Sequence, residues 1–185
     1  MRELTSIEEK ILDKTLYLIG KTGSFNVSIR AIAKEAGVNV SAINYYFRTK
    51  EEMLRHVKQF YINNTISAYS VLDNYEYDDE EKLILLANEI MEYTLKYPGI
   101  FIILKESKRD NLIDETSAKI IEVTDAMNQK MDQVLSRVFN HNSTTFQYNR
   151  LIFLSSILHP SSNSDLINFD QSIINNKEQR LNYIS

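Results

Sequence analysis

The sequence predicts an all-α fold in which an N-terminal three-helix helix-turn-helix domain is followed by a helical bundle. Apolar residues recur at spacings of three and four along most of the 185-residue chain, which is the pattern of helices with one buried side. Only four glycines and two prolines occur, fewer than the turns of a β-rich domain of this size normally need. The expected helices cover residues 7–19, 29–36, 40–47, 50–72, 79–95, 100–108, 112–139, 144–159 and a last stretch from about residue 176.

The first three helices are predicted from their capping residues. A capping box at residues 6–9 begins the first helix, and we expect Gly20 and Gly23 to end it. Ser28 and Asn39 have side chains that can accept hydrogen bonds from the first amides of the second and third helices. Two short helices therefore follow a longer one.

The later helices are predicted from a second set of signals. Residues 49–52 form another capping box, and the acidic residues 78–81 suit the positive end of a helix dipole. Residues 98–99 are Pro-Gly and should break the chain between two helices, and Pro160 should end the helix that precedes it. In the long helix expected over residues 112–139, Ile113 is assigned to the buried side.

Composition and charge exclude several classes of protein. Residues 1–60 hold 10 Lys+Arg and 7 Asp+Glu, net +3, whereas residues 61–185 hold 11 and 18, net −7. A phosphate backbone attracts only the part that carries cations, so the basic end is the candidate nucleic-acid surface. The sequence lacks a secretory signal and an apolar run of the roughly 18 residues that a membrane span needs, so we expect a cytoplasmic protein without membrane contact.

Catalytic and metal chemistry find little support in the sequence. The chain has no cysteine and three histidines, and the histidines lack the spacing of metal ligands. No glycine-rich loop that could hold a phosphate is present. We therefore expect neither enzymatic activity nor a cofactor or metal.

The second and third helices, with Gly37 between them, have the pattern of a helix-turn-helix. In this motif the second helix of the pair presents its exposed side to the major groove of DNA. Ile43 and Phe47, four residues apart, can anchor that helix on the protein. Its remaining side chains are compact or polar, and they can approach base edges closely. They are Val40, Ser41, Ala42 and Asn44.

Residues suited to phosphate contact surround this helix. Ser28 lies at a helix N-terminus, where amide donors and the helix dipole favour an anion. Lys50 begins the fourth helix, and Arg30 supplies a further cation. Tyr45 and Tyr46 add phenol groups, although one of these neighbours should pack inward because adjacent side chains on a helix point about 100° apart.

These residues resemble the heads of TetR-type bacterial transcriptional regulators, whose pattern is similar to "IA..AGV....IYYYF..KEEL". The matching segments are Ile32-Ala33, Ala36-Gly37-Val38, Tyr45-Tyr46-Phe47 and Lys50-Glu51-Glu52-Met53-Leu54. The resemblance covers roughly residues 6–60. It implies a DNA-binding domain over residues 1–48 and a ligand-binding and dimerisation domain over residues 49–185.

The resemblance also implies roles for individual residues. Base-reading candidates are Arg30, Val40, Ser41, Ala42 and Asn44, and phosphate candidates are Ser28, Tyr45, Tyr46 and Lys50. Asn44 departs from the residues common in the family at this position, so that contact with an adenine and contact with phosphate both stay open for it.

The body of the chain offers candidates for a ligand pocket and a dimer interface, each with plain core packing as the alternative. The pocket candidates are large and adaptable side chains, namely Met91, Phe101, Met127, Met131, Tyr148 and Phe153. The interface candidates lie on one apolar helix with small serines, namely Leu151, Leu154, Ser155 and Leu158.

The sequence thus predicts a sequence-specific DNA-binding regulator that acts as a homodimer on a palindromic operator. Repression released by a small apolar effector is the expected mode of action. Two alternatives stay open. One is a protein of the same fold that responds to a protein partner, and the other is a helical interaction module that never contacts DNA.

Overall fold

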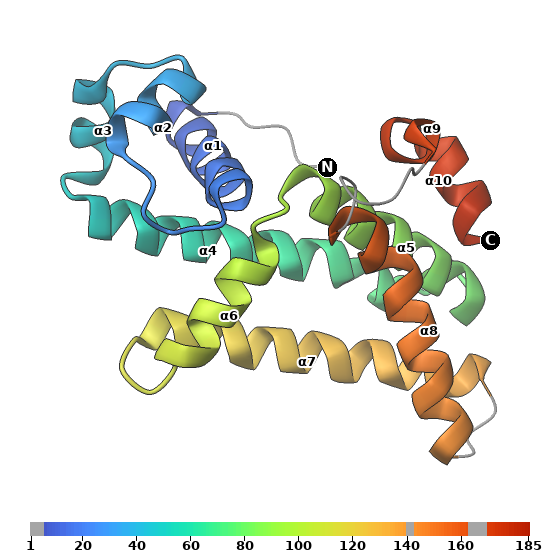
Figure 1. Cartoon of the computed structure of the whole chain (residues 1–185). Helices are drawn as coiled ribbons and strands as arrows, with labels where there is room; N and C mark the ends of the chain where they lie inside the picture. The colour runs from blue at the N-terminus through green and yellow to red at the C-terminus, as the bar shows by residue number, and fades with distance from the viewer. Residues whose placement is uncertain (1–5, 140–142, 163–169) are drawn as a thin grey trace. The chain divides into compact units, whose positions relative to one another are not determined.

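The computed structural model describes residues 6–139, 143–162 and 170–185, and every regular element in these residues is helical (Figure 1). The predicted all-α fold class is confirmed. The elements are α1 (Ile7–Thr22), α2 (Ile29–Ala36), α3 (Val40–Phe47), α4 (Lys50–Tyr69), the 3₁₀ turn η1 (Ser70–Asp73), α5 (Asp79–Lys96), α6 (Ile100–Asp110), α7 (Glu115–Val138), α8 (Ser143–Ser162), α9 (Gln171–Asn175) and α10 (Lys177–Ile184).

The chain packs into two compact units. Unit 1 comprises Met1–Asn64 and Tyr97–Val123, and unit 2 comprises Thr65–Lys96 and Thr124–Ser185. Helices α4 and α7 contribute residues to both units. The division expected from the sequence, after residue 48, separates a DNA-binding part from a regulatory part, and it stays a prediction about function.

Unit 1 contains α1, α2 and α3, which pack against one another around apolar side chains. The predicted anchors Ile43 and Phe47 are each only 1% exposed, and Ile32 of α2 is fully buried. Ser6 accepts a hydrogen bond from the amide of Glu9 at 3.1 Å, so α1 begins at the predicted capping box. The same side of each helix that shows apolar spacing in the sequence therefore forms the core.

The prediction that Gly20 ends α1 is wrong. The helix continues to Thr22 and ends at Gly23, whose φ of 66° is left-handed. Gly20 instead allows close backbone approach: a Cβ on it would lie 2.3 Å from the backbone nitrogen of Gly99, immediately before α6. Side-chain volume at either glycine would push α1 away from the start of α6, and this long-range requirement is not visible in local sequence.

Unit 2 has a core of its own, built from α5, α7 and α8. Its fully buried residues include Leu86, Met131 and Leu135, and Ile157 of α8 is 1% exposed. Helix α10 packs on α5. Its Arg180 is 5% exposed and donates hydrogen bonds to the side chains of Asn88 at 3.3 Å and Glu92 at 3.1 Å, so its charge is buried with partners.

Pro160 does not end α8, contrary to the prediction. The helix runs through it to Ser162. A proline lacks the amide that would bond the carbonyl four residues earlier, which is that of Ser156. The hydroxyl of Tyr183, on α10, donates to this carbonyl at 3.0 Å and replaces the lost hydrogen bond. A residue 27 positions away thus permits the proline.

The predicted start of the seventh helix is also wrong, because Asp114 caps α7. Its carboxylate accepts a hydrogen bond from the amide of Ser117 at 3.1 Å, and α7 begins at Glu115. Ile113, which we assigned to the buried side, lies in the preceding turn and is 87% exposed. The short α9 was not expected, whereas α10 begins close to the predicted residue 176.

Candidate nucleic-acid interface

Helix α3 is held in place by one side and presents the other to solvent. Asn39 caps it by accepting a hydrogen bond from the amide of Ala42 at 2.7 Å. Because Ile43 and Phe47 point into unit 1, the residues between them point outward. Ser41, Asn44 and Tyr45 are exposed. This geometry is what a helix needs if it is to enter a groove without moving first.

The exposed side of α3 carries small and polar groups. Val40 is 39% exposed, and Ala42 is half-buried beside it. The hydroxyl of Ser41 donates to the side-chain oxygen of Asn39 at 2.7 Å, which orients it while leaving its lone pairs as acceptors. Asn44 offers an amide that can donate and accept together, the property used to read adenine.

The tyrosines that follow differ in exposure. Tyr45 is 82% exposed, whereas Tyr46 is 39% exposed, and their rings contact edge to face at 5.3 Å between centroids. Tyr46 is therefore the member of the pair that turns toward the protein. Both hydroxyls remain available at the end of α3 nearest α4.

Arg48 occupies a strained position that ends α3. Its φ of 54° is the only positive value for a non-glycine among the described residues. Its amide donates to the carbonyl of Asn44 at 3.0 Å, which closes the last turn. An arginine in this conformation costs stability relative to glycine. It places an exposed cation between α3 and Lys50.

The N-terminus of α2 and that of α4 each have a capped first turn. Ser28 accepts a hydrogen bond from the amide of Ala31 at 3.1 Å and is exposed, as is Arg30. Thr49 accepts from the amide of Glu52 at 3.1 Å, which confirms the second capping box. Both helix starts lie in unit 1 with α3.

Lys50 is already oriented by another residue of unit 1. Its ammonium donates to the side-chain oxygen of Asn26 at 3.2 Å. Sequence reasoning did not single out Asn26, because the two residues are 24 positions apart. The asparagine holds the lysine with an uncharged partner, so the positive charge is not neutralised.

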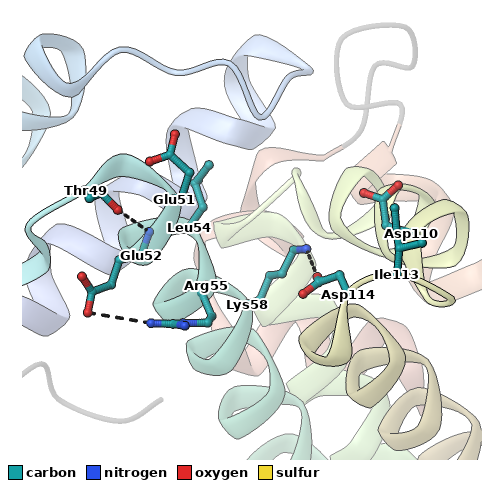
Figure 2. Close-up of a pocket in the computed structure, with 9 residues that line it drawn as sticks. All are labelled: Thr49, Glu51, Glu52, Leu54, Arg55, Lys58, Asp110, Ile113 and Asp114. Atoms are coloured by element: carbon teal, nitrogen blue, oxygen red, sulfur yellow. Dashed lines mark hydrogen bonds and ion pairs between the residues drawn. The ribbon is translucent and has the colours of Figure 1, made fainter.

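A second feature that the sequence did not reveal joins α4 to the start of α7. Lys58 donates to the carboxylate of Asp114 at 2.6 Å and to the hydroxyl of Ser117 at 2.8 Å (Figure 2). Partial burial disfavours the charge on Asp114, but the hydrogen bonds from Lys58 and Ser117 outweigh it and lower the pKa of this carboxyl to about 2. The three side chains form one charged network within unit 1.

The six predicted pocket residues do not gather in one described cavity. Met91 and Met131 are fully buried in unit 2, and Met127 and Phe153 are half-buried there. Tyr148 is 62% exposed. The sixth, on α6, is Phe101, which belongs to unit 1 and is 38% exposed. Their role in binding a ligand stays a prediction.

The predicted interface residues of α8 face two ways. Leu154 and Leu158 pack against the core of unit 2. Leu151 is 65% exposed, and Ser155 is exposed one turn later. Ile152, which was not singled out, is 66% exposed and extends the same outward stripe.

Two searches of the described residues returned nothing. No group of three or more His, Asp or Glu side chains that could hold a metal ion occurs among them. None of their helices has the length and apolar character that crossing a membrane requires.

Comparison with known proteins identifies the class. Residues 11–57 match the family model described as bacterial regulatory proteins, tetR family. The probable HTH-type transcriptional regulator YttP of Bacillus subtilis (strain 168) is 29% identical over 127 residues, which are 68% of this chain and 60% of YttP. The match thus spans less than two thirds of that relative.

Solved structures extend the likeness to the whole fold. The ketosteroid transcriptional regulator KstR2 of Mycobacterium tuberculosis is 14% identical with a TM-score of 0.71, covering 98% of this chain and 94% of that one. AibR, solved in complex with isovaleryl coenzyme A and operator DNA, is 16% identical with a TM-score of 0.67, covering 96% and 95%. The chain is of the TetR type, with the tetR-family N-terminal domain and a helical C-terminal part.

Proposed function

We propose that this protein is a DNA-binding transcriptional regulator whose α3 enters the major groove of duplex DNA. The observation that carries the proposal is the division of α3 into a buried apolar side, with Ile43 and Phe47, and an exposed side with Ser41 and Asn44. A helix so anchored can approach base edges with small polar groups. Support from the comparisons lies in the tetR-family match over the same residues.

Phosphate contact is assigned to the groups around α3. Ser28 and the first amides of α2 provide an anion site at a helix N-terminus. Lys50 contributes a cation, oriented by Asn26. Tyr45 and Tyr46 contribute hydroxyls. These groups position the helix, whereas α3 reads the sequence.

The active form in this proposal is a homodimer. Tyr148, Leu151 and Ile152 of α8 are each exposed by more than three fifths, and they lie at spacings of three and four, on one side of the helix. We refer to these three residues as the α8 stripe. A two-fold pair of such stripes would bury them and place two α3 helices about 34–36 Å apart on one side of DNA.

The mode of regulation is proposed as repression that a small apolar effector relieves. The adaptable side chains of unit 2, notably Met91, Met127 and Met131, suit such a ligand. AibR, similar in fold, was solved with both isovaleryl coenzyme A and operator DNA. If a protein partner gates the regulator instead, small apolar compounds would leave its thermal midpoint unchanged, whereas an effector would raise it.

Selection of bound sites from random duplex DNA at two salt concentrations tests DNA binding. We expect an enriched palindrome in the wild type. Lys50→Ala should weaken binding to all sequences and lower the salt slope by about 0.9, the value for one phosphate contact. The matched control Lys108→Ala, at an exposed lysine of α6, should leave the slope unchanged. Enrichment of no sequence by the wild type would contradict the proposal.

The variant Asn44→Ala separates the two roles left open for this residue. If Asn44 reads an adenine, the variant loses preference at one position of each half-site, by about 1–3 kcal/mol. If it contacts phosphate, affinity falls for every sequence and the base preferences persist. A variant with unchanged affinity and preferences would remove Asn44 from the interface.

A further inference from the structure

A pocket of about 700 Å³ lies in unit 1 between the first turns of α4 and the end of α6 (Figure 2). It is separate from the exposed side of α3 and from the residues assigned to the effector. One wall comes from α4, and the other comes from the last residue of α6 and the turn before α7. Its lining residues are Thr49, Glu51, Glu52, Leu54, Arg55, Lys58, Asp110, Ile113 and Asp114.

The pocket carries an excess of negative charge. Four lining residues are acidic and two are basic, which gives a net charge of −2. Each cation is matched inside the pocket. Arg55 lies 3.8 Å from Glu52, and Lys58 lies 2.6 Å from Asp114 with only 15% of its side chain exposed. These two pairs leave two further carboxylates of the lining.

The remaining carboxylates, Glu51 and Asp110, come from opposite walls. Within the described residues neither pairs with a cation of the lining, and Asp110 contacts Arg109 outside it at 3.1 Å. Figure 2 shows Glu51 on α4 and Asp110 on α6, on the two sides of the opening. Leu54 and Ile113 line the same space with apolar surface, and Ile113 is 87% exposed.

We propose that this pocket binds an aliphatic diamine or longer polyamine, with one ammonium group at Glu51, another at Asp110, and the alkyl chain against Leu54 and Ile113. Two positive charges balance the net charge of the lining, and an alkyl spacer covers apolar surface that water otherwise contacts. A metal dication would satisfy the charge but would leave the apolar walls unused. A monoamine would satisfy one carboxylate only.

Titration calorimetry on the full chain without DNA tests the site, so its result stands apart from the proposed DNA binding. The probes are diaminopropane, diaminobutane, diaminopentane and diaminohexane with terminal amines, at constant ionic strength because exposed charges are screened by salt. We expect one site per chain, a dissociation constant below about 1 mM for the best diamine, and a maximum of affinity at one chain length. Butylamine and Mg²⁺ should bind more weakly than that diamine.

Two isosteric variants locate the binding. Glu51→Gln and Asp110→Asn should each weaken the best diamine by about fivefold, the upper end for one exposed ion pair, and the double variant should weaken it further. Glu76→Gln, an exposed glutamate of unit 2, makes the same charge change and should leave affinity unaltered. Far-UV circular dichroism checks that each variant is folded.

Three results would overturn the proposal. The first is the absence of saturable binding by every diamine. The second is equal affinity in the wild type and in the folded double variant. The third is binding of Mg²⁺ or butylamine as tight as that of the best diamine, because the apolar walls or the second carboxylate would then contribute nothing.

Discussion

Helices α3 and α8 both present an exposed side to solvent, but the two sides differ in chemistry. That of α3 carries Ser41 and Asn44 with aromatic hydroxyls at its end. The α8 stripe carries a tyrosine and two branched aliphatic side chains, all more than 60% exposed. Polar groups on a rigid helix suit the edges of bases, whereas an apolar stripe suits another protein surface. Exposure alone therefore does not distinguish the two functions, but side-chain chemistry does.

The two helices also differ in how their ends are determined. Asn39 caps α3 from the position immediately before it, and Gly37 ends α2 just upstream with a φ of 64°. Helix α8 continues through Pro160 because Tyr183 of α10 satisfies the carbonyl of Ser156. The first arrangement is local in sequence and the second is not.

The largest expected effect concerns the α8 stripe. Leu151→Glu with Ile152→Glu would place four unpaired carboxylates in a two-fold interface, so dimer affinity should fall by at least about 100-fold. Sedimentation equilibrium measures this effect. Leu112→Glu, a leucine 93% exposed in unit 1, should leave association unchanged. If the double variant associates as the wild type does, α8 is not the interface.

A smaller effect tests whether α8 depends on a distant partner. Tyr183→Phe removes the donor to the carbonyl of Ser156 and should lower the free energy of unfolding by about 1 kcal/mol. In a Pro160→Ala background the helix amide is restored, so the same change should cost less. Urea unfolding of the four proteins of this cycle measures the difference. Equal costs in both backgrounds would show that the hydroxyl does not compensate for the proline.

The smallest expected effect comes from Asp114, whose cap on α7 combines a local partner, Ser117, with the distant Lys58. Its pKa is lowered from 3.8 to about 2 in the folded protein. The ionised carboxylate therefore stabilises the fold above pH 4, and this contribution is lost as pH falls from about 4 to 2. Asp114→Asn should cost less than about 1 kcal/mol at neutral pH, since 37% of the side chain is exposed.

Unfolding free energies measured from pH 7 down to pH 3 check this prediction. The difference between the wild type and Asp114→Asn should narrow below pH 4. Asp125→Asn, at an exposed position of the same helix, is the matched control and should show no such narrowing. A constant difference across the range would mean that the charge of Asp114 has no stabilising role.

The locality of these interactions explains which parts of the fold could be predicted. The bounds of α2 and α3 agree with those expected because Ser28, Gly37 and Asn39 act within a few residues of themselves. The role of Gly20 was wrong because its partner, Gly99, is far away in the sequence.

The candidate site divides in the same way. The outward direction of Ser41 and Asn44 follows from helix periodicity once Ile43 is assigned to the core. The contact of Lys50 with Asn26 and the pocket between α4 and α6 depend on tertiary packing. No pattern within a single helix indicates them.

The most direct test of the central claim is amide hydrogen exchange with and without DNA enriched by selection. If α3 occupies the groove, the DNA should slow exchange at residues 40–47 and leave the described residues of the α8 stripe unchanged in the dimer. Slowed exchange in α8 with no change across residues 40–47 would contradict the account, because DNA would then contact a surface other than the exposed side of α3.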